Sequence, residues 1–453
     1  MPNHFTVFCQ SGTFMASQKD SETSLKPTLS LFDATAVSVG AIIGAGIFVV
    51  TGVAAGLAGS AFVISMLMAA AVSLLTALSF VELTAWLPKE GSVYEYAYRL
   101  ISPFAGFISG WMWIFSNTFT GAAVALGFAQ YFTALFPVMP SNVTAALLSI
   151  AFTAMNYFGV RKSALLNNFL VTTKLAILAF FVILGTAYAN LGNYAPFSPF
   201  SMGVPYAAYF VFFAYGGFAR VAVISEEVKD ARRNVPRAIL LSLGISTAVY
   251  MLVGVVALGL VGAGALAASG SPLAAAMEAT GSKVAVYVIS AGAMLATSSV
   301  LLTSILGVSR VAYAMAKRRD LPQFLGKLHS KHATPYYSVL LVGAFTTAMA
   351  LFADLSGIVA MSTFALLFYY AFANVSALRL QNRARRYSRL VPAAGTAACL
   401  AMLVLVFFVS PQALIVGVVC VLAGVAFYVA MKALRKDEVS GQMLRPVKSS
   451  ASS

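Results

Sequence analysis

Stretches of about twenty apolar residues recur along nearly the whole chain, with short polar segments between them. A helix needs about 20 apolar residues to cross the hydrocarbon core of a bilayer. The pattern therefore predicts an all-α integral membrane protein with twelve spanning helices. Their expected ranges are 31–56, 60–87, 104–136, 142–160, 164–189, 203–225, 238–262, 284–316, 335–353, 356–379, 390–409 and 412–433.

Polar segments frame this apolar region at both ends. Residues 1–29 are rich in Ser and Thr and lack an apolar core followed by a cleavage site, so we expect a disordered cytoplasmic tail rather than a signal peptide. Residues 436–453 are expected to form a cytoplasmic tail after the last two spans, which lie in 381–435. The ten other spans fall into two groups of five, within 30–200 and 201–380.

Composition and charge support a membrane protein and predict its orientation. Hydrophobic residues make up 60% of the chain, charged residues 9%, and the mean hydropathy is +0.87, unlike a soluble domain. Of the 29 Lys and Arg, Lys174 is expected inside a span and Lys283 on the second face, which leaves 27 on the face of both termini. Short loops rich in Lys and Arg stay in the cytoplasm, so both termini are expected there, in a protein of the cell membrane. Basic residues scattered over loop ends do not indicate a nucleic-acid partner, for which a basic stripe is typical.

Two glycine-rich interruptions occur at matching places in the two groups of spans. They are GAIIGAGIF at 40–48 and FFAYGGFAR at 212–220. Irregular backbone at mid-membrane depth is tolerated only where it is buried in protein or lines a cavity. Paired interruptions are typical of secondary transporters whose substrate binds between two broken helices. The alternative is that the glycines only allow close packing of helices.

The two interruptions offer complementary chemistry to a ligand. A half-helix that begins near Ala45 and Gly46 presents free N–H groups and a positive dipole end, which suits a carboxylate. Carbonyls freed at the second interruption suit an ammonium group, and its aromatic side chains can cover the ligand. We therefore expect a zwitterionic substrate.

Lys174 is expected deep inside the span 164–189. It is the eleventh residue of that span, which corresponds to a depth of roughly 16 Å at 1.5 Å per residue. An ionisable group at such depth is a functional hypothesis by default. The alternative to a functional role is that the lysine side chain extends along the helix to the membrane–water interface, which is difficult from that depth. We therefore predict that transport is coupled to a proton that this amine gains and loses.

These segments resemble the amino acid, polyamine and organocation (APC) transporter superfamily. The resemblance covers residues 30 to about 380 and implies a LeuT-like fold. In that fold helices 1–5 and 6–10 form two inverted repeats, helices 1 and 6 are broken, and two further helices are peripheral. The similar segments are the two interruptions, SEEVK at 225–229, ARRNVPRAI at 231–239, KEGSVYEYAYR at 89–99 and GVSRVAYAMAKRRDLP at 307–322.

The resemblance also implies roles for single residues. The N–H groups of Ala45 and Gly46 would bind the substrate carboxylate, and Phe213 would be the gating aromatic residue. Asn117 would contact the substrate, with a hydrogen bond between helices as its alternative. The carbonyls of Ile42, Phe213 and Gly216 would receive the amino group. The full set of expected substrate contacts is Ile42, Gly44, Ala45, Gly46, Asn117, Phe213, Gly216 and Phe218.

The resemblance assigns Lys174 a coupling role as well. In some members of the family a lysine at this place substitutes for the sodium ion that related transporters bind. By that correspondence the Lys174 amine would face the carbonyl of Gly40 and the hydroxyl of Ser298 or Ser299.

One departure from the family pattern bears on the substrate. Ala219 stands where the family often has glutamate, so an acidic group near the pocket is missing. This argues against cationic substrates. The main hypothesis is a proton symporter of neutral amino acids that works by alternating access. The alternative within transporters is an exchanger in which Lys174 only stabilises the structure.

Other classes of function find little support in the sequence. An intramembrane enzyme needs a nucleophile with its base, or metal ligands, inside the spans. All three histidines lie outside the expected spans, and no HExxH or GxSxG motif occurs. A channel would favour charged rings or filter loops, and none is visible. We therefore expect no enzyme activity, no cofactor and no metal, although a sensor that does not transport remains an alternative.

Overall fold

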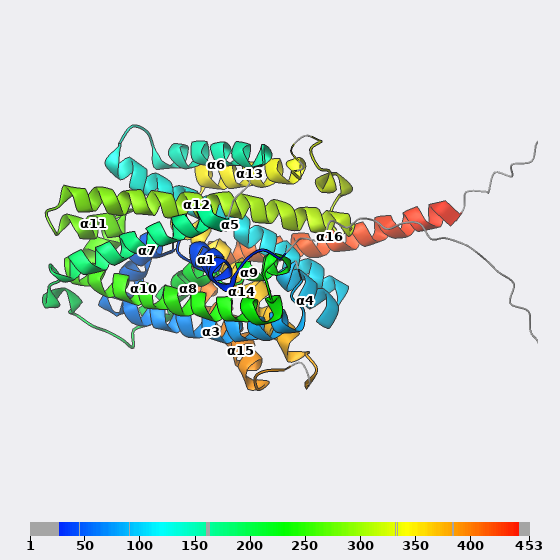
Figure 1. The fold of residues 1–453 in the computed structure, drawn as a ribbon, viewed down its shortest axis with the longest axis horizontal. Helices are drawn as coiled ribbons and strands as arrows, with labels where there is room; N and C mark the ends of the chain where they lie inside the picture. The colour runs from blue at the N-terminus through cyan, green and yellow to red at the C-terminus, as the bar shows by residue number, and fades with distance from the viewer. Residues whose placement is uncertain are drawn as a thin grey trace, which may run out of the picture.

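The computed structural model describes residues 27–44, 46–89, 91–159, 164–330, 332, 334–382 and 385–443, with side chains as far as residue 433. Residues 1–26, which make up most of the expected N-terminal tail, therefore lie outside the described residues. The described residues form helices that run mostly along the long axis of the molecule (Figure 1). Within these ranges the only β contact is an isolated parallel bridge between Leu29 and Val228.

The first half of the chain forms helices in each expected range. Two short helices between spans were not expected: α4, Ser92–Leu100, and η3, Leu191–Tyr194. The others are α1 Leu31–Ile42, η1 Gly46–Val50, α2 Thr51–Ala58, η2 Gly59–Ala61, α3 Phe62–Trp86, α5 Pro103–Leu135, α6 Ser141–Tyr157 and α7 Ala164–Thr186.

The second half follows its expected ranges, with extensions of α10 at both ends and of α16, and with two short helices between spans, α11 and η5, that were not expected. Helix α10 continues past the expected end at 262, where Gly262 adopts a positive φ of 74° that interrupts the helix. Helix α16 runs to Met443, beyond the expected span. The elements are α8 Gly203–Tyr215, α9 Arg220–Val223, η4 Ser225–Glu227, α10 Ala231–Ala268, α11 Pro272–Glu278, α12 Lys283–Lys317, η5 Gln323–Gly326, α13 Tyr336–Phe352, α14 Leu355–Leu378, α15 Leu390–Val409 and α16 Pro411–Met443.

The length and apolarity of these helices identify an integral membrane protein. Among the described residues, nine helical stretches are long and apolar enough to cross a membrane. One of them, Leu31–Trp86, has 56 residues and contains α1 to α3, which is more than twice the length that one crossing needs. Helix α13 is apolar but has only 17 residues. The count of twelve spans stays a prediction.

Helices α5, α8 and α9 form the centre of the molecule. In the most apolar part of α5, and of the stretch Gly203–Val223, 78% of the residues are buried, compared with 17% in α16. Helix α5 packs against α12 and α14, and α1 packs against α10 and α7. The interrupted helices therefore pack against α3, α7, α10, α12 and α14, while α16 lies at the periphery (Figure 1).

Both glycine-rich segments interrupt their helices. Helix α1 ends at Ile42, and a π-helical turn begins at Gly46. Helix α8 ends at Tyr215, and α9 begins at Arg220. Both stretches of irregular backbone lie inside the protein, where neighbouring helices supply hydrogen-bond partners for the backbone.

The glycines also let the two interrupted helices touch through their backbones. A Cβ atom on Gly46 would lie 2.3 Å from the Cβ of Ala214. A Cβ atom on Gly217 would lie 2.4 Å from backbone atoms of Ala41 and Ile42. Both distances are shorter than real Cβ contacts, so a side chain would push the helices apart. Close packing and interruption of the helices thus occur together, and are not exclusive alternatives.

This contact predicts a stability effect at Gly217. Gly217→Ala should lower the free energy of unfolding by about 1–3 kcal/mol, because the new methyl group overlaps with backbone rather than with a movable side chain. The loss should appear as a lower melting temperature of the purified protein in detergent. Gly244→Ala is the matched control, since nothing lies within 4 Å of its added methyl group. Equal melting temperatures for the two variants would contradict the proposed backbone contact.

Candidate functional site

A small cavity lies where the two interrupted helices meet. Its volume is about 30 Å³, which is room for about two water molecules and not for an amino acid. The site is therefore contracted in this conformation. Its lining comes from α1, η1, α5, α8, α9, α12 and α14, and consists of Ala41, Ile42, Gly44, Gly46, Ser116, Asn117, Thr120, Val124, Phe213, Ala214, Gly216, Gly217, Arg220, Val300, Leu366 and Tyr369.

Most of the expected substrate contacts border this cavity. Six of them line it: Ile42, Gly44, Gly46, Asn117, Phe213 and Gly216. Ala45 lies outside the described residues. Phe218 does not line the cavity, because its ring is fully buried against Phe80 and Tyr370, with centroid distances of 5.7 and 5.2 Å. Its position is that of a core residue.

The carbonyls expected to receive an amino group already accept hydrogen bonds. The Ile42 oxygen accepts from the Tyr250 hydroxyl at 2.7 Å and from the Gly44 N–H at 2.9 Å. The Gly216 oxygen accepts from Tyr370 at 3.0 Å, and the Phe213 oxygen accepts from the Gly216 N–H at 3.1 Å. A carbonyl has two lone pairs. An ammonium group can therefore add to Gly216 or Phe213, but at Ile42 it must displace a protein donor.

Tyr250 of α10 is a site residue that sequence reasoning missed. Its hydroxyl lies 2.7 Å from the Ile42 oxygen and 3.1 Å from the Ala214 oxygen, so it joins the two interruptions. Tyr131 of α5 likewise donates to the Phe48 oxygen at 2.6 Å. Both side chains are fully buried. In the sequence they are aromatic residues within apolar runs, which is the pattern of ordinary core residues.

Lys174 of α7 lies beside the first interruption, with a side chain that is 1% exposed. Its amine donates to the oxygens of Gly40 and Ile43, both at 3.2 Å, and to the Ser299 hydroxyl at 2.5 Å. The expected contacts with Gly40 and Ser299 are thus present, while Ser298 does not bond to the amine. Lys174 therefore connects α7 to α12 and to the carbonyl end of α1.

A second small cavity separates Lys174 from the central cavity. Its volume is about 40 Å³. Ala41 and Arg220 line both cavities, so these two residues form the wall between them. The remaining lining is Val37, Gly40, Asn167, Leu170, Val171, Lys174, Ser299 and Thr303.

The position of Arg220 differs from the one expected from the sequence. The sequence predicts it among the basic residues on the face of the termini, but its side chain borders both cavities. One terminal nitrogen, Nη2, donates to the Asn117 amide oxygen at 3.1 Å and to the Ser304 hydroxyl at 3.0 Å. Asn117 therefore makes the hydrogen bond between helices that was its alternative role, and it lines the cavity as well. No carboxylate is part of either cavity's described lining.

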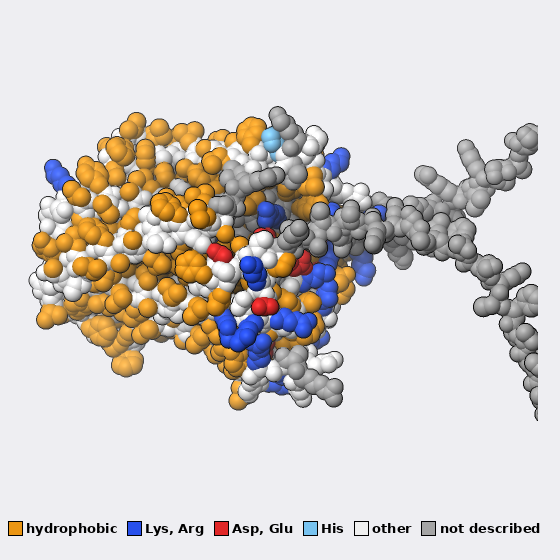
Figure 2. All heavy atoms as spheres, viewed as in Figure 1, with side chains coloured by type: hydrophobic (Ala, Val, Ile, Leu, Met, Phe, Trp, Pro, Cys, Tyr) orange, Lys and Arg blue, Asp and Glu red, His pale blue; other side chains and the backbone are white. Residues whose placement is uncertain are grey.

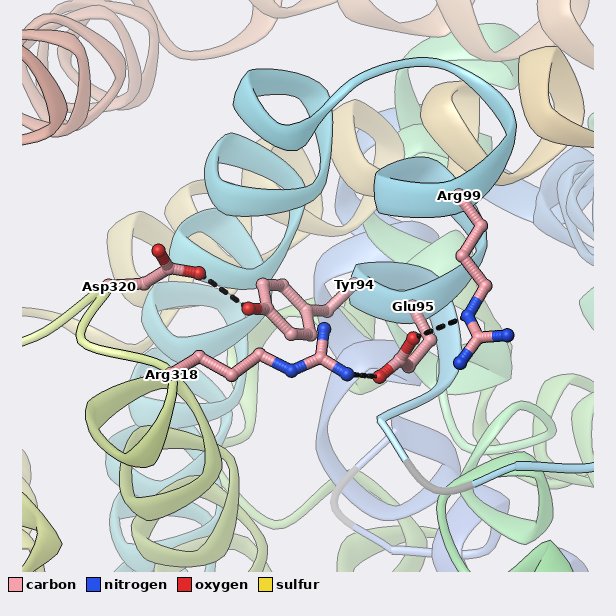
Figure 3. Close-up of polar contacts among 5 residues, drawn as sticks. All are labelled: Tyr94, Glu95, Arg99, Arg318 and Asp320. Carbon is pink, nitrogen blue, oxygen red and sulfur yellow. Dashed lines mark hydrogen bonds and ion pairs between the residues drawn. The ribbon is translucent and has the colours of Figure 1, made fainter. Parts of the chain in front are cut away.

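A separate polar network joins α4 to the end of α12 (Figure 3). The Tyr94 hydroxyl donates to Asp320 at 2.5 Å, and the buried Glu95 carboxylate pairs with Arg99 at 3.0 Å and with Arg318. The Arg318 guanidinium also lies 5.2 Å from the Tyr94 ring centre. Burial and the hydrogen bond to Asp320 raise the pKa of Tyr94, so its hydroxyl remains a proton donor at neutral pH.

Comparison with known proteins gives similarity over nearly the whole chain. The family described as amino acid permease matches residues 29–431. The chain is 36% identical over 416 residues to an uncharacterised transporter of Mycobacterium tuberculosis, with 90% of this chain and 92% of that protein covered. A methylthioribose transporter of Bacillus subtilis is 32% identical over 75% of this chain and 78% of its own length. The branched-chain amino acid permease BcaP of the same organism is 29% identical, with 80% and 82% covered.

The bridge formed by Tyr250 predicts a loss of stability when its hydroxyl is removed. Tyr250→Phe should lower the free energy of unfolding by about 1–3 kcal/mol, because water cannot replace the donor at buried carbonyls. Tyr194→Phe is the control, since its bond to the Val255 oxygen at 3.0 Å is exposed and its loss should cost less than about 1 kcal/mol. Thermal melting in detergent compares the two. An equal or larger loss for Tyr194→Phe would show that Tyr250 does not support the interruptions.

Proposed function

The chain belongs to the amino acid permease family, and from this premise we propose that it imports amino acids across the cell membrane by proton symport. Members and relatives of this family are transporters and not enzymes. In this proposal the twelve predicted spans form a LeuT-like arrangement of two five-helix repeats. The substrate binds between the interrupted helices, and the helices alternate between outward-open and inward-open states around it.

The observation that carries the coupling proposal is the set of acceptors around Lys174. At least three oxygens accept from its amine within 3.2 Å. A protonated amine has three N–H donors, whereas a neutral amine has two. Loss of the proton therefore releases at least one contact to α1 or α12. Because a conformational equilibrium shifts only through a difference in interaction free energy, this change is able to bias the helices between states.

The cavity supports an amino acid as the transported solute. Gly44 and Gly46 leave backbone open to a carboxylate at the first interruption, and Gly216 and Phe213 retain free lone pairs for an ammonium group. The absence of a carboxylate from the described lining, together with Arg220, disfavours a cationic side chain. The sequence-based preference for a neutral side chain stays a proposal. Branched-chain amino acids, after which BcaP is named, have such side chains.

The network of Tyr94, Glu95, Arg318 and Asp320 supports an inner gate in this proposal. It ties α4 to the end of α12 at the end of the molecule where Lys and Arg gather (Figure 2). Basic residues concentrate on the cytoplasmic side of membrane proteins. We therefore assign this end, and both termini, to the cytoplasm, and we propose that the network opens when the substrate is released inside.

An exchanger without proton coupling is the second candidate. The Lys174 amine is almost fully buried and well supplied with acceptors, as a purely structural crosslink would be. In that case its proton would never leave, and replacement of the lysine would affect stability rather than the driving force.

Replacement of Lys174 separates the two candidates. Lys174→Ala in liposomes should abolish accumulation of a labelled amino acid driven by an acidic exterior. Substrate binding should change by about twofold at most, because the amine lines the second cavity and not the central one. Lys283→Ala removes an equal charge from an exposed position and should accumulate substrate like the wild type. Accumulation by Lys174→Ala against a substrate gradient would leave the exchanger, or another proton carrier, as the better account.

The proposed orientation predicts a labelling pattern. In a background without native cysteines, Asn193→Cys should react with an impermeant maleimide on intact cells, because η3 lies opposite the basic end. Gln381→Cys, which follows α14 at an exposed position, should react only after permeabilisation. The reverse pattern would place the termini outside.

A further inference from the structure

Arg220 is a charged group that the proposed coupling by Lys174 does not use. It begins α9, directly after the second interruption, and its side chain borders both cavities. The arginine therefore shares the central cavity with the interruption residues that are proposed to bind the substrate.

The guanidinium is held in place by neutral groups only. Asn117 and Ser304, on α5 and α12, accept from Nη2 and fix the plane of the fork. No described carboxylate lies within 4.0 Å of Arg220, since the ion pairs among described residues join Glu95 to Arg99 and Arg318. Its charge therefore has no counter-ion among the described residues.

Part of the fork remains open. The nitrogens Nε and Nη1 of Arg220 make no hydrogen bond to a described residue, and the residue as a whole is only partly buried. Arginine cannot release its proton at accessible pH. A buried charge needs a partner, and the planar fork of arginine matches a carboxylate through two parallel hydrogen bonds.

We propose that Arg220 forms an anion subsite of the central cavity that binds the side-chain carboxylate of an acidic amino acid. The inference rests on the proposed function and deepens it, because it names the substrate class. It also changes the expectation of a neutral side chain, which followed from the missing acid at Ala219 and did not take the neighbouring arginine into account. The α-carboxylate and α-amino group bind at the interruptions, and the second carboxylate extends to Arg220.

A free inorganic anion could also bind to the Arg220 guanidinium. The two ligands are distinguished by whether the anion competes with amino acids for the cavity. A side-chain carboxylate arrives together with an α-amino acid group and competes with other amino acids for the cavity. A chloride ion would bind without any amino acid and would not compete with a neutral one.

Glutamate and glutamine provide the test, because they have nearly equal size and differ in side-chain charge. Binding of each to the purified full-length protein is measured by the ligand-induced shift in melting temperature, in a buffer of low ionic strength without chloride or an added carboxylate. We expect the wild type to bind L-glutamate about 10- to 100-fold more tightly than L-glutamine, the range for a hydrogen-bonded charge in a buried site. Arg220→Gln should remove this preference and retain binding of L-glutamine. Arg220→Lys, which retains the charge without the fork, should show an intermediate preference.

Arg310→Gln is the matched control variant. Arg310 lies on α12, is exposed and lines neither cavity, so its loss removes the same charge from a neighbouring helix. It should retain the full preference for L-glutamate. A preference lost in both variants would mean that overall charge, and not a subsite, selects the ligand.

Each of the remaining outcomes decides for or against the anion subsite or the proposed function. Equal affinities of the wild type for glutamate and glutamine would overturn the subsite and leave the proposed amino acid transport intact. Binding of no α-amino acid by the wild type would instead contradict the proposed function itself. Stabilisation by chloride that depends on Arg220, without competition by glutamate, would replace the carboxylate by an inorganic anion. Loss of glutamine binding in Arg220→Gln, with a retained elution profile, would make the arginine structural.

Discussion

The need to satisfy backbone carbonyls inside the protein governs this structure. Each interruption of a helix at membrane depth frees carbonyl groups that have no water to bond, and an unsatisfied group there costs several kcal/mol. Long polar side chains from neighbouring helices supply the missing donors. Tyr250 serves Ile42 and Ala214, Tyr370 serves Gly216, and Lys174 serves Gly40 and Ile43. The interruptions are therefore stable only as part of the whole helical assembly.

In the proposed function, substrate binding and proton binding would act on the same few residues of backbone. The Ile42 carbonyl, bonded by Tyr250, lies between the carbonyls of Gly40 and Ile43, which Lys174 bonds. A change at either donor therefore acts on the same short end of α1. In the proposed mechanism no long pathway is needed, since the two events meet within four residues of one helix terminus.

Sequence reasoning identified the features that depend on local pattern. The ranges of the helices, the two interruptions and the contact of Lys174 with Gly40 and Ser299 could be expected from hydropathy, glycine spacing and family resemblance. Tyr250 could not, because an aromatic residue in an apolar run looks the same whether or not its hydroxyl has a buried partner. Phe218 was assigned to the cavity by its place next to Gly217, but the turn after α8 directs its ring towards α3 and α14. Arg220 was expected near the end of the span 203–225, among the basic residues on the face of the termini, because no local pattern shows which face of a short helix borders a cavity.

The two cations that line the cavities differ in a way that separates their proposed roles. Scales of membrane insertion assign about 2.5–3.5 kcal/mol to an Arg or Lys at the centre of a spanning helix. Lysine can relieve this cost by releasing a proton, whereas arginine remains charged under all accessible conditions. Lys174 is thus suited to a switch whose state changes during transport, and Arg220 to a fixed charge that a ligand must complement. Since Arg220 forms part of the wall between the two cavities, an anionic ligand that neutralises it would also reduce the repulsion felt by a protonated Lys174. Binding of the substrate would then favour the protonated lysine, which is the direction of coupling that symport requires.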